Sequence, residues 1–418
     1  MSQESIEVQS PAISETLSPV KKSIRRRPSQ LSPPKPKTPG PYILSTEDAH
    51  DASEYVQTLH HVIRSSKKLV VVVGAGISVQ AGIPDFRSST GVFQSVKNEY
   101  KLKGSGQSMF DFSVYKDKET TAIFHSMISS LHNISKGASG TSFHRLLSLL
   151  STEHRLLRLY TQNVDGIELS LTGLDTVVPL PSRAPWPKTI QLHGGLQNMI
   201  CAKCGWMAPF DPKVFHNDDV PECSECRDLD QVREVVGKRT QGIGRLRPRV
   251  VLYNEFNPDG EAIGKVTASD LKSRPDALLV VGTSLKVPGV RRIVKEMAQS
   301  VHAAGGVAIW VNIDGPPSVK MFEGLFDLIL TGDCQDIPEV LNRKPKSIEP
   351  DTPTKKLKSS TTPTPSPTKR LKITSTAVKA SKAAATSGLV KPPMSASVKD
   401  VFKVKKEILV SVPVKDEK

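Results

Sequence analysis

The sequence has few cysteines, few aromatic residues and no long apolar run. Of its 418 residues, 5% are aromatic and five are cysteines. No stretch approaches the roughly 20 apolar residues that a membrane-spanning helix needs, so we expect no membrane association. Residues 1–42 lack the apolar stretch of a secretory signal peptide, so we expect none there. Four of the cysteines form two CxxC pairs, which favours a reducing compartment and a metal site over a disulfide framework.

Net positive charge is absent from the middle of the chain and concentrated at its ends. The formal net charge is +15, of which residues 1–42 contribute +4, residues 343–418 contribute +12 and residues 43–342 contribute −1. The ends are rich in Pro, Ser, Thr and Lys, and hold too little apolar surface to offset the entropy lost on ordering. We predict a disordered basic, Pro-rich arm at 1–45, a folded domain at 46–342 and a disordered Lys/Ser/Thr/Pro-rich tail at 343–418.

Short apolar runs and helical patterns alternate through the middle of the chain. Strands are predicted at 69–73, 157–160, 189–192, 250–252, 277–281, 307–311 and 328–330, and helices at 48–65, 142–150, 289–304 and 337–341. Runs that are apolar on both faces suit a parallel sheet covered by helices. This alternation predicts an α/β fold with a doubly wound parallel sheet.

A glycine-rich turn follows the first predicted core strand. It reads Gly74-Ala75-Gly76-Ile77-Ser78 and continues, after three residues, with Gly82-Ile83-Pro84-Asp85-Phe86-Arg87. Such glycines let the backbone approach a pyrophosphate, and a helix start supplies unpaired N–H groups. The dehydrogenase pattern G-x-G-x-x-G is not met, so an ordinary strand-to-helix turn remains the alternative. Arg87 is suited to pair with a phosphate, and Phe86 either covers a ligand or packs in the core.

Three polar residues follow later predicted strands. Asn163 and Asp165 come after 157–160, where an amide and a carboxylate on the same side of an extended segment match a carboxamide. An Asx turn or a helix N-cap is the alternative use of these two residues. His193 precedes two glycines, and the usual histidine pKa of about 6.5 suits a general base. A lone histidine is more often structural than catalytic, so the position of His193 in the fold must show which role it has.

The paired cysteines give the strongest metal signal. Cys201-x-x-Cys204 and Cys223-x-x-Cys226 are separated by 18 residues. Four thiolates complete a closed tetrahedral shell, so we predict one structural zinc ion with no activated water. A redox role for one CxxC pair is the alternative. Cys334 stands alone, and we expect it to be a small buried residue.

Together these features resemble the sirtuins, the NAD-dependent protein lysine deacylases. The segments Thr161–Asp165, Gln191–Gly194 and Val281–Leu285 complete a likeness that covers residues 45–341 in the family's order. The length of the chain, its long ends and the amino-acid sequence of 252–260 are similar to those of a fungal nuclear branch of this family, which acts on histones. The resemblance implies that 46–342 is a catalytic domain with a Rossmann-type sheet and a zinc module inserted at about 196–246.

The resemblance also implies roles for individual residues. It makes His193, Asn163 and Asp165 catalytic, with His193 as the general base that activates a ribose hydroxyl. It implies NAD contacts from residues at the phosphates, the nicotinamide and the adenosine: Gly74, Ala75, Gly76, Ile77, Ser78, Gly82, Ile83, Pro84, Asp85, Phe86, Arg87, Gln162, Asn163, Val164, Asp165, Gly282, Thr283, Ser284, Asn312, Ile313, Asp314 and Cys334. Segments 251–255 and 285–289 match the strands that flank the peptide substrate. Tyr253-Asn254 replaces the family's Phe-Gly, and Asn tolerates the positive φ of that turn.

The sequence therefore predicts an NAD-dependent deacetylase of histones in the nucleus, which binds NAD and one structural zinc ion. Its products are nicotinamide, O-acetyl-ADP-ribose and deacetylated lysine. Expected partners are an acetylated histone or another acyl-lysine protein, a nuclear import receptor that reads the basic clusters, and nucleic acid bound weakly and without specificity. A mono-ADP-ribosyltransferase and a catalytically idle, zinc-containing chromatin scaffold are the alternatives. The Pro-rich segment 172–187 is expected to be an exposed loop.

Overall fold

A parallel sheet forms the centre of the computed structural model, which describes residues 42–44, 54–85, 91, 106–215 and 220–342. Within these residues the sheet has seven strands in the order β1-β10-β9-β8-β2-β3-β4, and every pair in it is parallel. The strands are β1 (Tyr42–Ile43), β2 (Leu69–Val73), β3 (Leu156–Thr161), β4 (Thr189–Gln191), β8 (Ala277–Val281), β9 (Val307–Asn312) and β10 (Leu328–Thr331). The predicted doubly wound α/β fold is confirmed.

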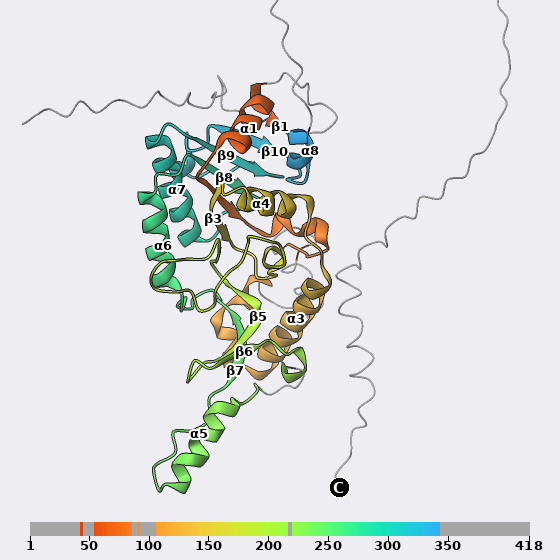
Figure 1. Cartoon of the computed structure of the whole chain (residues 1–418). Helices are drawn as coiled ribbons and strands as arrows, with labels where there is room; N and C mark the ends of the chain where they lie inside the picture. The colour runs from red at the N-terminus through yellow and green to blue at the C-terminus, as the bar shows by residue number, and fades with distance from the viewer. Residues whose placement is uncertain (1–41, 45–53, 86–90, 92–105, 216–219, 343–418) are drawn as a thin grey trace, which may run out of the picture. The chain divides into compact units, whose positions relative to one another are not determined.

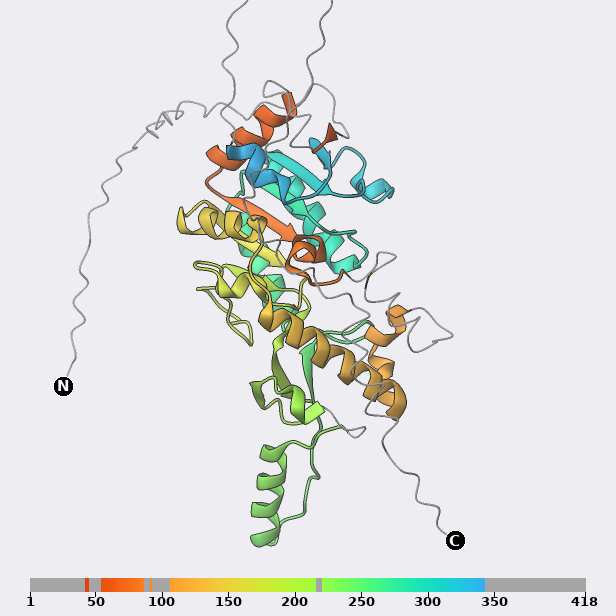
Figure 2. The same cartoon turned by 90° about the vertical axis from the view of Figure 1, so that its right-hand side faces the viewer.

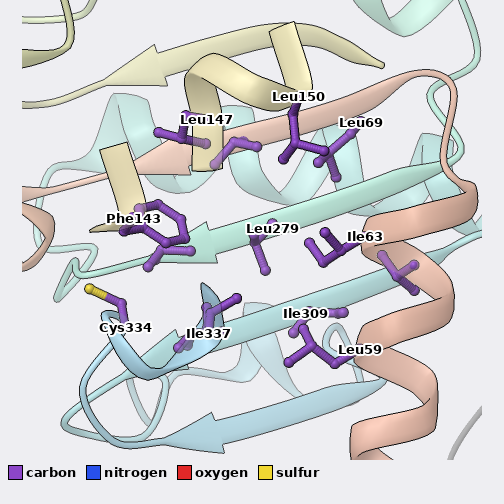
Figure 3. Packing of buried hydrophobic residues seen from close by; sticks show 14 of the residues in the cluster. Leu59, Ile63, Leu69, Phe143, Leu147, Leu150, Leu279, Ile309, Cys334 and Ile337 are labelled. Atoms are coloured by element: carbon purple, nitrogen blue, oxygen red, sulfur yellow. The ribbon is translucent and has the colours of Figure 1, made fainter. Parts of the chain in front are cut away.

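Helices cover both faces of this sheet (Figure 1). On one face lie α1 (Glu54–Ser65), α4 (Ser142–Thr152) and α8 (Asp336–Asn342), and on the other lie α6 (Gly260–Lys272) and α7 (Pro288–Ala303). Every residue of β2 is buried, with Leu69, Val71 and Val73 on the first face and Val70 and Val72 on the second. Figure 3 shows the first face, where Leu59, Phe143 and Ile337 from three helices meet Leu279 of β8.

A smaller antiparallel sheet lies next to the paired cysteines, and its central strand ends at Cys201. It has the order β6-β5-β7, with β5 (Gly194–Cys201), β6 (Met207–Pro209) and β7 (Leu246–Val250). Helix α3 (Lys118–Gly137) lies alongside this sheet (Figure 2), and its Phe124, Met127 and Ile128 share one apolar cluster with Cys201, Cys223 and Cys226. Helix α5 (Ser224–Val235) follows Cys223. Short 3₁₀ helices η3 (Gly106–Phe110), η4 (Phe112–Lys116), η6 (Pro212–Phe215) and η7 (Lys320–Phe322) complete the connections.

Most predicted core elements are present within a residue or two of their expected ends. The prediction of a parallel strand at 250–252 is wrong both in its residues and in the sheet to which it assigned them. The observed strand β7 ends at Val250 and pairs antiparallel with β5 in the small sheet. Helix 48–65 is described from Glu54 onward, and its first residues lie outside the described ones. The predicted arm at 1–45 lies outside them except for 42–44, and the tail at 343–418 lies wholly outside. Segment 172–187 contains neither helix nor strand, as expected.

In the described part of the chain, no helix combines the length and the apolar character needed to cross a membrane.

A buried ion pair fastens β3 to α6. Arg158 donates from Nε and Nη2 to the two carboxylate oxygens of Asp270 over 2.9 Å each, and the side chains are 10% and 2% exposed. Asp270→Asn leaves the guanidinium buried without its counter-charge, so we expect the free energy of unfolding to fall by about 3–5 kcal/mol. Urea denaturation measures this. A loss below about 1 kcal/mol would mean that the pair behaves like a surface ion pair.

Candidate functional site

The site lies where the chain reverses its direction across the parallel sheet. From β2 the chain continues to β3 and β4 on one side, and it later returns to β8 on the other. Ligands of open α/β sheets bind beside the carboxyl ends of the strands at such a point. A cavity of about 950 Å³ opens there, and its wall includes the ends of β2, β3, β8 and β9.

The glycine turn forms one side of this cavity. A Cβ on Gly76 would lie 2.6 Å from Cα of Gly282, and one on Gly74 would lie 2.8 Å from the Gly282 carbonyl oxygen. Any side chain at these positions therefore forces β2 and β8 apart at their carboxyl ends. The two glycines therefore let the turn pack closely against the segment after β8 at this side of the cavity.

The predicted helix start after this turn is wrong. The chain forms two short 3₁₀ helices instead, η1 (Ala75–Ile77) and η2 (Val79–Ala81). The N–H groups of Gly74, Gly76, Ile77 and Ser78 donate to carbonyls of the protein. The expected row of unpaired N–H groups is therefore missing, because the tight turn uses these donors itself.

Gln162 and Asn163 directly follow the end of β3, and both line the cavity with the glycine turn. Gln162 Nε2 donates to the Val73 carbonyl (3.1 Å) and to Thr283 Oγ1 (2.9 Å), which ties the end of β3 to β2 and to the segment that follows β8. Asn163 lines the cavity, and its Nδ2 donates to Ser78 Oγ over 3.2 Å. Its Oδ1 is buried and has no partner within the described residues. An unpaired buried acceptor at a cavity wall suits a ligand N–H donor.

Asp165 does not reach the cavity wall. It is 9% exposed, and its Oδ1 accepts from Ile167 N over 2.9 Å at the start of η5 (Ile167–Ser170). This is the Asx turn that the sequence left open as an alternative. Burial raises the pKa of this carboxyl above its usual value.

His193 lies between the two sheets and lines the cavity. Its Nδ1 is 3.2 Å from the Gln162 carbonyl oxygen. Because a carbonyl only accepts, Nδ1 carries the hydrogen of the neutral ring, and Nε2 is the ring's acceptor. The backbone is fixed as well, since the His193 carbonyl accepts from Val251 N over 2.9 Å and Gly194 has a φ of 70°.

The two predicted substrate segments, 251–255 and 285–289, both contribute to the cavity wall. Neither is a strand in the described structure, although Tyr253 exchanges backbone hydrogen bonds with Phe110 and Phe112 over 2.7 and 3.0 Å. Asn254 has a φ of 59°, so the expectation that Asn preserves this turn is confirmed.

The remaining predicted cofactor residues divide into three groups. Ala75, Asp85, Val164, Ser284, Asn312, Ile313, Asp314 and Cys334 line the cavity together with the residues above. Ile77, Ser78, Gly82, Ile83 and Pro84 do not line it. Phe86 and Arg87 lie outside the described residues. Cys334 is buried as expected, its Sγ lies 3.8 Å from the Gly76 carbonyl oxygen, and burial raises its pKa to about 12.

The four paired cysteines converge on one point. Their sulfur atoms all lie within 4.8 Å of one another, and the pairs Cys201–Cys226 and Cys204–Cys223 are each 3.8 Å apart. A tetrahedral zinc ion with bonds of about 2.3 Å places its sulfur ligands about 3.8 Å apart. Backbone N–H groups of Lys203 and Cys204 point at Cys201 Sγ over 3.4 Å, as suits a thiolate. The donor set therefore fits a closed zinc site.

Sequence reasoning missed the apolar part of the cavity wall. Phe110, Ile263, Val290 and Ile293 line it from η3, α6 and α7. These residues resemble any apolar residue that packs in a core, so only the tertiary arrangement reveals their position. Lys286 and Asn257 also line the cavity, and no pattern in the sequence singled them out.

Known proteins resemble this chain in sequence and in fold. A model of the Sir2 family matches residues 74–289. The NAD-dependent protein deacetylase hst4 of Emericella nidulans is 49% identical over 302 residues, which are 72% of this chain and 51% of that protein. The protein of the same name from Schizosaccharomyces pombe is 50% identical over 312 residues, 74% of each chain. The NAD-dependent histone deacetylase HST4 of Saccharomyces cerevisiae is 41% identical over 349 residues, 77% of this chain and 90% of that protein.

The chain spans about half the length of the Emericella relative. Among solved structures, a Sir2 protein with a deacetylated p53 peptide and 3'-O-acetyl-ADP-ribose superposes with a TM-score of 0.50 at 23% identity. The match covers 68% of this chain and 96% of that one, which shows a common fold.

Proposed function

Because this chain belongs to the Sir2 family, we propose that it is an NAD-dependent protein lysine deacetylase that acts on histones in chromatin. The observation that carries the proposal is the position of His193, whose ring lies in one cavity with Asn163 and the glycine turn. The names of the relatives support NAD dependence, and that of the Saccharomyces protein supports histones as substrates.

The cavity fits NAD at three places along its wall. Gly74, Gly76 and Gly282 line the cavity without side chains where a pyrophosphate would lie, and the unpaired Oδ1 of Asn163 suits the carboxamide N–H of nicotinamide. Asn312–Asp314 and Cys334 lie along the same wall, where the adenosine would bind. When bound, NAD supplies the ribose that accepts the acyl group and nicotinamide as the leaving group.

His193 is arranged to receive a proton from a hydroxyl in the cavity. Its Nε2 accepts the proton, and the Nδ1–H continues to donate to the Gln162 carbonyl while the ring is positive. The carbonyl therefore fixes the tautomer before the proton transfer and stabilises the charge after it. The apolar residues Leu252, Ile263 and Val290 limit the water that competes for this proton.

We place the catalytic domain at 46–342 and its zinc module at about 196–246, with the zinc as a structural ion. The acyl-lysine peptide would lie between 251–255 and 285–289, where main-chain hydrogen bonds need little sequence specificity. Nuclear location and binding of an import receptor rest on basic clusters such as Lys21–Arg27, which lie outside the described residues. Weak binding of nucleic acid rests on the same charge.

The test is mass spectrometry of acetylated histones incubated with the zinc-loaded protein. We expect each modified lysine to lose one acetyl group only when NAD is present, with equal amounts of nicotinamide and O-acetyl-ADP-ribose released. Nicotinamide release with ADP-ribose attached to protein would indicate the mono-ADP-ribosyltransferase instead. Binding of histones with no nicotinamide release would indicate the idle scaffold.

A further inference from the structure

Beneath the nicotinamide end of the cavity lies a second carboxyl group, Glu168, to which no role has been assigned. Glu168 belongs to η5, three residues after Asp165, and its exposed fraction is 0%. The Thr161 hydroxyl and the Asp165 carboxyl lie beside its side-chain oxygens, although neither oxygen makes a hydrogen bond of ordinary geometry. A fully buried carboxyl group with only a hydroxyl and a second carboxyl beside it is poorly placed to carry a negative charge.

The local backbone holds the two carboxyl groups together. Gly166 adopts a φ of 68°, and the Asp165 Oδ1 caps Ile167 N over 2.9 Å, which starts the 3₁₀ turn. Glu168 lies on η5 and Asp165 two residues before its start, and the two side-chain carboxyls interact directly. Gln197 Nε2 donates to the Asp165 carbonyl over 3.2 Å, which anchors the turn to β5. Asp165 and Glu168 therefore form a buried pair.

Two negative charges are not stable in this place. Burial disfavours an ionised carboxylate, and a second carboxylate beside it disfavours it further. Burial and the charge of Asp165 raise the pKa of Glu168 to about 8, and the hydroxyl of Thr161 opposes this in part. Burial also raises the pKa of Asp165.

Positive groups on the neighbouring helix do not compensate. Helix α4 packs against η5 and carries His144 and Arg145. Burial lowers the pKa of His144 to about 4, so it is neutral. Arg145 is exposed and donates to the Gly140 carbonyl.

We propose that Glu168 is a positioning residue that remains protonated at neutral pH, so that the buried pair it forms with Asp165 holds at most one negative charge behind Asn163. The neutral acid fills the space under the 163–165 turn without repelling Asp165. Its ionisation places a second charge in the pair, which displaces the turn and weakens the nicotinamide end of the site. The effect on catalysis rests on the proposed function, but the protonation itself does not.

The first experiment compares the stability of wild type and Glu168→Gln as the pH changes. The unfolded chain releases the Glu168 proton near pH 4.5, whereas the folded chain retains it up to about pH 8. Wild-type stability from this group therefore falls as the pH rises through that range, and glutamine has no proton to lose. We expect the melting temperature of the variant relative to wild type to rise by about 5 °C or more between pH 5 and pH 8, then to level off. A difference that stays constant overturns the proposal.

The second experiment observes the proton directly in the wild-type protein, so the result does not depend on how the variant folds. We expect infrared spectroscopy to show the carbonyl band of a protonated carboxyl at pH 7 that disappears near pH 8. Asp165→Asn should lower the pH at which this band disappears, because the neighbouring charge is gone. A wild-type protein without the band at pH 7 contradicts the proposal.

Two further measurements separate this result from others. Glu261→Gln is the matched control, since Glu261 lies on the surface and Lys265 lowers its pKa. It should give no relative rise in melting temperature between pH 5 and pH 8.

In a deacetylation assay, the ratio of kcat/KM for NAD at pH 9 to that at pH 7 should be higher in Glu168→Gln than in wild type. An equal ratio alongside a positive stability result would confirm the protonation and remove only its effect on catalysis.

Discussion

His193→Ala is expected to lower kcat for deacetylation by about 10²–10⁴-fold, because the variant lacks the general base of the proposed reaction. The fold should persist, since the backbone hydrogen bond from Val251 N to the residue 193 carbonyl does not depend on the ring. The measurements are steady-state deacetylation with an acetylated histone peptide, circular dichroism and zinc content.

His132→Ala is the matched control for this prediction. His132 also hydrogen-bonds a carbonyl through Nδ1, that of Leu196 at 2.9 Å, but it lies on α3 and does not line the cavity. Its turnover should remain within a few-fold of wild type. Turnover of His193→Ala at the wild-type rate would remove the assigned role and, with it, the main support for the proposed function.

Replacing Cys223 by alanine should release the zinc ion and unfold the small sheet. Binding of a structural zinc ion to four cysteines contributes about 10–16 kcal/mol to folding in small zinc domains, so loss of one ligand removes several kcal/mol. Cys223 is fully buried in the cluster that joins α3 to the small sheet, so its loss also opens a cavity. We expect wild type to contain one zinc ion per chain and the variant to contain less than a tenth of that by atomic emission.

Cys334→Ala provides the comparison for zinc content. It removes a buried thiol on the far side of the site and should retain the full amount of metal. Hydrogen exchange should increase in α5 and β5 of the Cys223 variant and stay unchanged in α1 and α8. A metal-free wild-type preparation with an intact small sheet and full activity would refute the structural role of zinc.

The parallel sheet was predictable from sequence because its strands are buried on both faces. Runs such as 69–73 and 277–281 have no polar residue, and such short runs are typical of strands covered on both sides by helices. The small sheet was not predicted, since β5 and β7 contain polar residues and pair with each other over a long stretch of sequence, and β6 is only three residues long. The strand predicted at 250–252 failed for a related reason. Its apolar residues cover the cavity, and only the pairing of Val250 with Gly194 ends β7 there.

The polar residues of the site were predictable because they follow strand ends whose positions the apolar runs indicate. Asn163 and His193 line the same cavity, although 29 positions separate them in the sequence. The hydrogen bonding of the glycine turn was not predictable from sequence. The dihedral angles of the turn determine which of its N–H groups remain unpaired, and the residue types alone do not give these angles. The buried state of Glu168 was also hidden, because a glutamate in a sequence is usually exposed.

Strand β5 begins at Gly194, directly after His193, and ends at Cys201, a predicted zinc ligand. At about 3.3 Å per residue, these eight residues place the metal roughly 25 Å from the imidazole along one continuous backbone. The pairing of this strand with β7 holds at Gly194 and again from Met199 to Cys201, with a shift in register between them. We expect a metal ion bound at the cysteines to fix one end of this strand, while the hydrogen bond from Val251 N to the His193 carbonyl fixes the other. Oxidation of the thiolates is therefore expected to loosen β5 from its cysteine end first, and hydrogen exchange along the strand would measure how far the loosening extends toward the imidazole.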